Sequence, residues 1–184
     1  MSRTAILDAA EAIMRDEGYA AVSSRKVASV AGLKSKLVHY YFQTMDDLFA
    51  ALLQRVEERH FQGLCTAIAS SDPLAALWKL SIAANLPRLH KEFVALATHR
   101  ERLRLDIARS AERTRSIYAA AVTRAIEDRG LDSGSFPPLA LAIIMDGVAR
   151  VINTDKELGT SAGHAEAIAF VEGFLASAPA DEAR

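Results

Sequence analysis

The sequence predicts an all-α protein built of two parts. Apolar residues recur at helical spacing along most of the 184 residues, of which only five are proline. The helical segments are short up to about residue 45 and long beyond it, which favours a small three-helix unit over residues 1–45 and a helical bundle over residues 46–184. With 51% apolar and 24% charged residues, the composition is that of a folded protein.

An amphipathic helix is predicted over residues 3–17, and Gly18 ends it. Its apolar stripe consists of Ile6, Leu7, Ala10, Ile13 and Met14. A stripe of this kind must be covered, and we expect the next two helices to cover it.

The stretch Ser24–Tyr41 predicts two short helices joined by a tight turn, which is the organisation of a helix-turn-helix. Ser23 or Ser24 can cap the first of these helices. Gly32 supplies the backbone angle that the turn requires, because glycine adopts positive φ without steric cost.

Longer helices are predicted after residue 45. The first spans residues 46–70, and the next spans residues 72–86 and begins with an Asp-Pro pair. Pro87 is expected to break this helix, and a shorter helical piece follows through residues 93–96.

Residues 100–129 form the longest periodic segment and carry six arginines between positions 100 and 115. Such a series allows either a second nucleic-acid surface or a solvated face with ion pairs. Asp106 with Arg109 and Glu112 with Arg115 stand at i,i+3 spacing, where opposite charges meet on a helix. We therefore favour the ion-paired face.

The last two predicted helices, residues 139–153 and 164–178, have few partners within so short a chain. The first of them is apolar on almost every side, so it must be covered all round. Pairing with the same two helices of a second copy, as a four-helix bundle, supplies that cover. The interface residues expected are Ile144, Val151, Ile168, Val171, Phe174 and Leu175.

Three features favour a cytoplasmic location without a membrane partner. Cys65 is the only cysteine, so no disulfide can form within the chain. The longest apolar run, residues 139–145, is far shorter than the ~20 residues of a membrane helix. Acidic residues interrupt the N-terminal segment, which is therefore unlike a secretory leader.

The sequence contains no motif typical of catalysis or of cofactor binding. His60, His90, His99 and His164 match no spacing of metal ligands, and no glycine-rich phosphate loop or nucleophile elbow is visible. We therefore expect no enzyme activity, no metal and no cofactor.

The segment around the predicted turn resembles the tetracycline-repressor (TetR) family of transcriptional regulators. In that family the DNA-binding module ends in a pattern close to A-G-V-S-x-G-x-L-Y-x-Y-F-x-x-K-x-x-L. The residues in register with this pattern are Ala31, Gly32, Leu33, Val38, Tyr41, Phe42 and Leu48. The resemblance covers residues 3–53, and beyond them it rests on helix number, helix lengths and the apolar penultimate helix.

The resemblance implies a helix-turn-helix DNA-binding domain followed by a ligand-binding and dimerisation domain. It places the DNA contacts at Ser24, Arg25, Ser35, Lys36, Leu37, His39, Tyr40 and Tyr41. The chemistry agrees, because Arg25 and Lys36 can neutralise phosphates or reach guanine, and hydroxyl groups can bind the DNA backbone. The first 45 residues carry six basic and four acidic side chains, a net charge of +2.

This chain departs from the family pattern at four positions. Lys34 stands where a capping serine is usual, so we expect Ser35 to cap the third helix instead. Lys36 replaces a common glycine and adds a cation, whereas Met45 replaces a lysine that often contacts phosphate. His39 replaces the commonest tyrosine, which alters the base contacts at that position.

The family also implies a pocket for a small-molecule effector. Candidate lining residues are Trp78, Asn85, Phe93, Leu96, His99, Tyr118, Met145 and Val148. For each of them, packing in the core is the alternative interpretation. Methionine and aromatic side chains suit a mainly apolar ligand, which Asn85 or His99 could orient.

The sequence therefore predicts a homodimeric, ligand-responsive regulator of transcription, most often a repressor in this family, that binds a pseudo-palindromic double-stranded operator. The helix over residues 46–70 is the expected lever between effector and DNA. The alternative is a helical small-molecule-binding protein, or an all-α enzyme, that has kept the fold without specific DNA binding.

Overall fold

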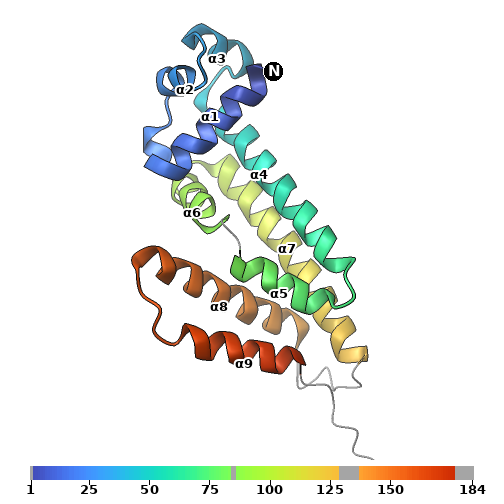
Figure 1. The fold of residues 1–184 in the computed structure, drawn as a ribbon. Helices are drawn as coiled ribbons and strands as arrows, with labels where there is room; N and C mark the ends of the chain where they lie inside the picture. Colours follow the sequence, from blue (N-terminus) through green and yellow to red (C-terminus); the bar gives the residue numbers. More distant parts are fainter. Residues whose placement is uncertain (1, 84–85, 129–136, 177–184) are drawn as a thin grey trace, which may run out of the picture. The chain divides into compact units, whose positions relative to one another are not determined.

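The computed structural model describes residues 2–83, 86–128 and 137–176. Within these residues the chain forms α-helices and one short 3₁₀ helix, with no strand (Figure 1). The elements are α1 (Ser2–Glu17), η1 (Tyr19–Ala21), α2 (Ser24–Val30), α3 (Ser35–Tyr41), α4 (Met45–Ile68), α5 (Pro73–Ala83), α6 (Leu86–Ala97), α7 (Glu101–Asp128), α8 (Pro138–Leu158) and α9 (His164–Ala176). The predicted all-α class is confirmed.

The chain divides into two compact units. The first comprises residues 1–60 and 88–109, and the second comprises residues 61–87 and 110–184. α1, α2 and α3 lie entirely in the first unit, whereas α4 and α7 contribute residues to both. The functional division after residue 45 stays a prediction.

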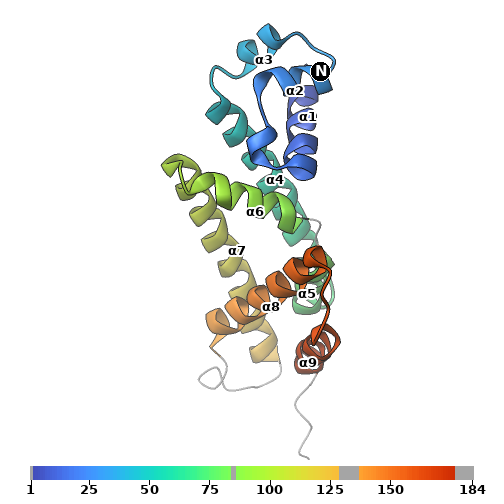
Figure 2. The same cartoon turned by 90° about the vertical axis from the view of Figure 1, so that its left-hand side faces the viewer.

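The first unit contains the three N-terminal helices, which pack together (Figure 2). The predicted apolar stripe of α1 is buried, each side chain being at most 3% exposed: Ile6, Leu7, Ala10, Ile13 and Met14. Val27 of α2 and Val38 of α3 are also fully buried, at 0% and 1% exposure. The outer faces of α2 and α3 remain free to carry polar side chains.

The turn between α2 and α3 depends on Gly32, whose φ of 66° lies in the left-handed region, as predicted. The backbone N–H of Gly32 donates to the Ser29 carbonyl at 3.2 Å, and that of Leu33 donates to the Ala28 carbonyl at 2.9 Å. These bonds close the end of α2 and set the direction in which α3 leaves.

The two short helices begin differently. Ser23 is the cap of α2, and its hydroxyl oxygen accepts the backbone N–H of Lys26 at 3.4 Å. The expectation that Ser35 caps α3 is wrong, because Ser35 is the first helical residue. Lys34 occupies the cap position and makes no side-chain capping bond there.

Two helix boundaries differ from the prediction. Pro87 does not break a helix but is the second residue of α6, where a missing N–H costs no hydrogen bond. The described part of α5 spans Pro73–Ala83. α8 continues beyond its predicted end at Asn153 to Leu158, and Gly159, with φ of 78°, caps it.

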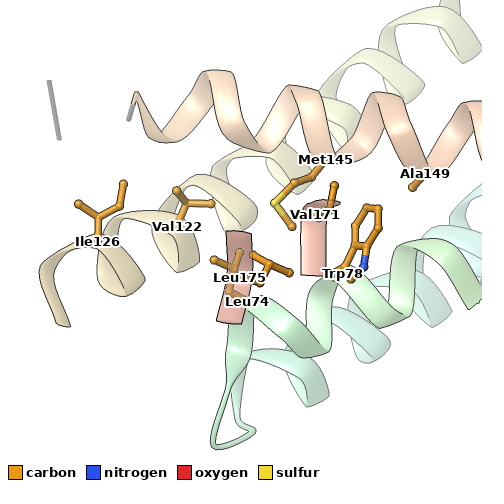
Figure 3. Close-up of a cluster of buried hydrophobic side chains, with 8 residues drawn as sticks. All are labelled: Leu74, Trp78, Val122, Ile126, Met145, Ala149, Val171 and Leu175. Atoms are coloured by element: carbon orange, nitrogen blue, oxygen red, sulfur yellow. The ribbon is translucent and has the colours of Figure 1, made fainter. Parts of the chain in front are cut away.

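The second unit has a core formed where α5, α7, α8 and α9 meet (Figure 3). Its buried residues are Leu74, Trp78, Val122, Ile126, Met145, Ala149, Val171 and Leu175. Two side-chain hydrogen bonds also join helices to α5: the Tyr118 hydroxyl donates to the Leu77 carbonyl at 3.0 Å, and Asn153 Nδ2 donates to the Ser81 carbonyl at 2.9 Å. The Tyr118 bond is buried and the Asn153 bond is partly buried, and both help to fix the helix positions.

None of the helices in the described ranges combines the length and apolar character that a bilayer crossing requires. The same ranges hold no group of three or more histidine, cysteine or acidic side chains arranged to bind a metal ion.

Candidate nucleic-acid interface

The face of α3 that points away from the core carries four of the eight predicted DNA contacts. Lys36, His39, Tyr40 and Tyr41 are exposed, and Tyr40 is 78% exposed, which is unusual for so large an aromatic side chain. The rings of Tyr40 and Tyr41 meet edge to face, with centroids 5.3 Å apart. Each ring therefore restricts the orientation of the other.

The remaining predicted contacts are less accessible. Ser35 and Leu37 of α3 are half-buried, as is Ser24 at the start of α2, whereas Arg25 is exposed. Leu37 can still offer methyl groups at the helix surface, but it has less exposed area than its neighbours. The exposed polar and cationic side chains are thus the stronger candidates for DNA contact.

Cations on this face keep their charge available. No carboxylate of the described residues pairs with Arg25, Lys34 or Lys36, whereas Lys26 of α2 pairs with Glu17. Lys34 is not among the predicted contacts, although it is exposed and directly precedes α3. The sequence already indicated Lys34 as a candidate, because a cation there replaces the usual capping serine.

The position of α3 is supported from its C-terminal side by a capping box at α4. The Thr44 hydroxyl accepts the Asp47 N–H at 3.1 Å, and an Asp47 carboxylate oxygen accepts the Thr44 N–H at 3.0 Å. Met45, where the family often has a phosphate-binding lysine, is half-buried at the start of this helix.

A charge network joins α1 to α4 within the first unit. Glu11 is only 8% exposed and accepts a hydrogen bond from Arg59 Nη2 at 2.7 Å. Arg55 pairs with Asp8 and lies 3.9 Å from Glu11. Two arginines therefore compensate two acidic residues, which ties α1 to α4.

Two further contacts within the same unit join α6 to η1 and the residue before α7 to α4. Glu92 of α6 accepts the backbone N–H of Tyr19 at 2.7 Å. Arg100, just before α7, donates to Asp46 at 2.7 Å and lies 5.6 Å from the Phe49 ring centroid. Neither contact was predicted, because each joins residues more than fifty positions apart.

The arginine series of α7 is largely engaged. Arg109 pairs with Asp106 as predicted, and Arg104 lies 3.7 Å from Glu101. The expected Glu112–Arg115 pair is not formed among the described residues; this part of the prediction is wrong. Arg113 instead lies over the Phe61 ring, 4.0 Å from its centroid. These contacts favour the structural interpretation of the series.

The predicted pocket residues lie in both units. In the first unit Phe93 and Leu96 are each 1% exposed, and His99 is exposed. In the second unit Trp78 and Met145 are core residues, Val148 packs against the same core, and Tyr118 belongs to a neighbouring cluster. Asn85 lies outside the described residues. The pocket stays a prediction.

The predicted dimer residues fall into two groups. Ile144 and Val151 of α8 are 56% and 59% exposed, as an interface with a second copy requires. Val171 and Leu175 of α9 are buried in the core of their own chain, and Ile168 and Phe174 pack against it.

Phe170 is 78% exposed and is the large apolar side chain on the outer face of α9, although it is not among the predicted residues. Leu139, Ile143 and Leu158 of α8 are also exposed. The exposed apolar surface of the last two helices is therefore extensive.

Residues 6–52 match the family model described as bacterial regulatory proteins, tetR family. The N-terminal part of the chain belongs to the TetR family. The match spans α1 to α3 and the start of α4, the same region that the residues in register with the family pattern predicted. The TetR resemblance is thereby confirmed.

The TetR-type fold extends along the chain. A TetR transcription regulator from Haloarcula marismortui aligns with a TM-score of 0.76 and 21% identity, covering 95% of this chain and 96% of its own. NemR of E. coli in its reduced form aligns with a TM-score of 0.79 and 16% identity, covering 98% and 100%. The multidrug binding protein EbrR, complexed with imidazole, aligns with a TM-score of 0.64 and 23% identity, covering 98% of both chains.

At these identities the structural likeness concerns the fold of the TetR-type chain, not its ligand or its operator. No curated protein matches the sequence at a significant level.

Proposed function

We propose that this protein is a TetR-type transcriptional regulator, acting as a repressor, that binds a pseudo-palindromic operator as a homodimer and leaves it when a small, mainly apolar effector binds. The observation that carries the proposal is the exposed face of α3. It carries Lys36, His39 and Tyr40. Arg25 of α2 and Lys34, just before α3, add cations that pair with no carboxylate of the described residues.

The DNA contact has a physical basis in this arrangement. Cations without carboxylate partners can neutralise phosphates and release counterions, which supplies affinity that does not depend on sequence. Lys36, His39 and the tyrosine hydroxyls add hydrogen-bonding groups along one helix face, where base edges in a major groove can be read. Binding and specificity therefore both come from the helix-turn-helix.

The dimer proposal is supported by the exposed apolar side chains of α8 and α9. Ile144 and Val151 of α8 and Phe170 of α9 are each more than half exposed, and water contact with this surface is costly. Two-fold pairing of α8 and α9 would cover it as a four-helix bundle. A two-fold dimer presents two copies of α3, which must meet major grooves about one helical turn, ~34 Å, or a multiple of it apart.

The effector proposal is supported by the apolar character of the second unit and by one unused donor. Trp78 Nε1 is buried and has no hydrogen-bond acceptor among the described residues. A mainly apolar molecule with a single acceptor oxygen or nitrogen would suit such a donor. The likeness in fold to a multidrug binding protein is consistent with this chemistry.

The test is the salt dependence of binding to a random-sequence DNA duplex of about three helical turns. Lys36→Ala should make the slope of log K against log salt shallower by ~1 per protomer, ~2 for the dimer. Lys79→Ala removes an exposed cation of α5, in the second unit, and serves as the matched control that should leave the slope unchanged. Equal slopes for the wild type and Lys36→Ala would remove Lys36 from the interface.

A protein that binds no duplex at low salt would instead support the alternative of a helical small-molecule-binding protein. Met45 favours this alternative, because it stands where the family often has a lysine that contacts phosphate.

A further inference from the structure

The cations of the first 60 residues divide into two groups. Four are engaged by carboxylates, and they lie on α1, α2 and α4: Arg15, Lys26, Arg55 and Arg59. The other four have no carboxylate of the described residues within ion-pair distance: Arg3, Arg25, Lys34 and Lys36. Arg25 and Lys36 are predicted DNA contacts, and Lys34 directly precedes α3, which leaves Arg3 to be explained.

Arg3 lies near the start of α1, yet its guanidinium is held at the end of α3. The central carbon of the guanidinium is 5.3 Å from the ring centroid of Phe42, the residue that caps the C-terminus of α3. Phe42 is only 5% exposed, so the ring is fixed by the core of the unit. A contact with a ring face orients the guanidinium without neutralising its charge.

The acidic side chains nearest in sequence to Phe42 do not compete for Arg3. Asp46 pairs with Arg100, and Asp47 forms the capping box with Thr44. The positive charge of Arg3 is therefore uncompensated, and its five N–H donors remain available.

The spacing of these cations fits the geometry of a major groove. α3 has seven residues and is therefore ~10 Å long. Lys34 immediately precedes its first residue, and Arg3 lies beside the residue that follows its last. A B-DNA major groove is ~12 Å wide and is bordered by a phosphate backbone on each side. Cations at both ends of α3 can thus reach phosphates on both strands.

We propose that Arg3 is a phosphate-binding residue, oriented by Phe42, that anchors the C-terminal end of α3 to one DNA strand while Lys34 and Lys36 anchor the N-terminal end to the other. This inference rests on the proposed DNA-binding function.

The experiment compares Arg3→Met with Arg3→Lys. Methionine keeps an unbranched apolar side chain over the Phe42 ring but removes the charge, whereas lysine keeps the charge. On the random-sequence duplex, Arg3→Met should make the salt slope shallower by ~1 per protomer, ~2 for the dimer, and Arg3→Lys should keep the wild-type slope. The urea midpoints of both variants should equal that of the wild type.

Lys79→Met is the control for loss of an exposed cation elsewhere, and it should change neither quantity. A wild-type slope for Arg3→Met overturns the inference. A slope change in both Arg3 variants together with a lower urea midpoint also overturns it, because that result indicates a purely structural role for Arg3. If Lys36→Ala shifts the slope and Arg3→Met does not, this inference fails while the proposed function stands. Failure of the wild type to bind duplex DNA overturns both.

Discussion

Glu92 of α6 provides the capping acceptor for η1: its carboxylate Oε2 lies 2.7 Å from the backbone nitrogen of Tyr19. The residue before Tyr19 is Gly18, which has no side chain with which to cap the turn. A carboxylate 73 positions away in sequence replaces the local cap. α6 is therefore bonded to the segment that connects α1 with α2.

Replacing Glu92 should destabilise the first unit. Glu92→Ala leaves the partly buried N–H of Tyr19 without an acceptor, and we expect a loss of about 2 kcal/mol in the free energy of unfolding, as for other hydrogen bonds to charged groups. Glu92→Gln retains a neutral acceptor and should lose less. Urea denaturation followed by circular dichroism measures both. Glu101→Ala, an exposed acidic residue of α7, is the control; a Glu92→Ala protein as stable as this control would contradict the prediction.

Tyr118 should make stability fall at high pH. Burial raises the pKa of Tyr118 from 10.0 to about 12. The hydrogen bond with the Ser81 side chain lowers this pKa, and the negative charge of Asp146 raises it by a smaller amount. A raised pKa in the folded state means that the neutral side chain contributes its full stability below pH 10 and loses it as the pH rises towards 12. The contribution is about 2–3 kcal/mol at ~1.4 kcal/mol per pKa unit.

The measurement is the free energy of unfolding between pH 9 and pH 12. Tyr118→Phe should lose ~1 kcal/mol at neutral pH, because the Leu77 carbonyl loses its donor, but its stability should fall less steeply above pH 10 than that of the wild type. Tyr40→Phe, at an exposed position, should retain the wild-type profile. Identical profiles for Tyr118→Phe and the wild type would exclude this role.

Charge on the outer faces of α8 and α9 should dissociate the proposed dimer. Ile144→Glu and Phe170→Glu each place a carboxylate on an exposed apolar side-chain position, where its desolvation on pairing is costly. Sedimentation velocity should show monomers, and operator binding should weaken because the two α3 helices are no longer linked.

Leu105→Glu, a comparable change on the exposed side of α7, is the matched control and should leave the oligomeric state unchanged. Val171→Glu should instead lower the stability of the chain itself, because Val171 is buried in the core of the second unit. A dimer that survives both Ile144→Glu and Phe170→Glu would place the interface elsewhere.

The helix-turn-helix was predictable because its signals are local. Gly32 marks the left-handed residue of the turn, Ser23 marks a helix start, and the buried pattern of α1 identifies its inner face. Each of these depends on residues a few positions apart, so a sequence pattern carries the information.

The predictions failed at positions where tertiary contacts, not local sequence, determine the structure. Periodicity placed the four predicted residues of α9 on one side of the helix, but it could not decide whether that side faces a second copy or the core of the same chain. Packing against α5 and α8 decides it. Similarly, Ser35 was expected to cap α3 because lysine has no side-chain acceptor for a cap, but α3 begins at Ser35 and Lys34 occupies the cap position. The Tyr19–Glu92 bond lies beyond any local pattern.

Trp78 is the only tryptophan in the chain and is 1% exposed in the core of the second unit. Its fluorescence consequently reports the unfolding of that unit alone, whereas circular dichroism averages over the helices of both. Coincident transitions by the two methods would identify a single cooperative unit, and separate transitions would assign an individual stability to each half of the protein. The protein therefore contains a native optical probe for assigning the effects of effector and DNA to one unit or the other.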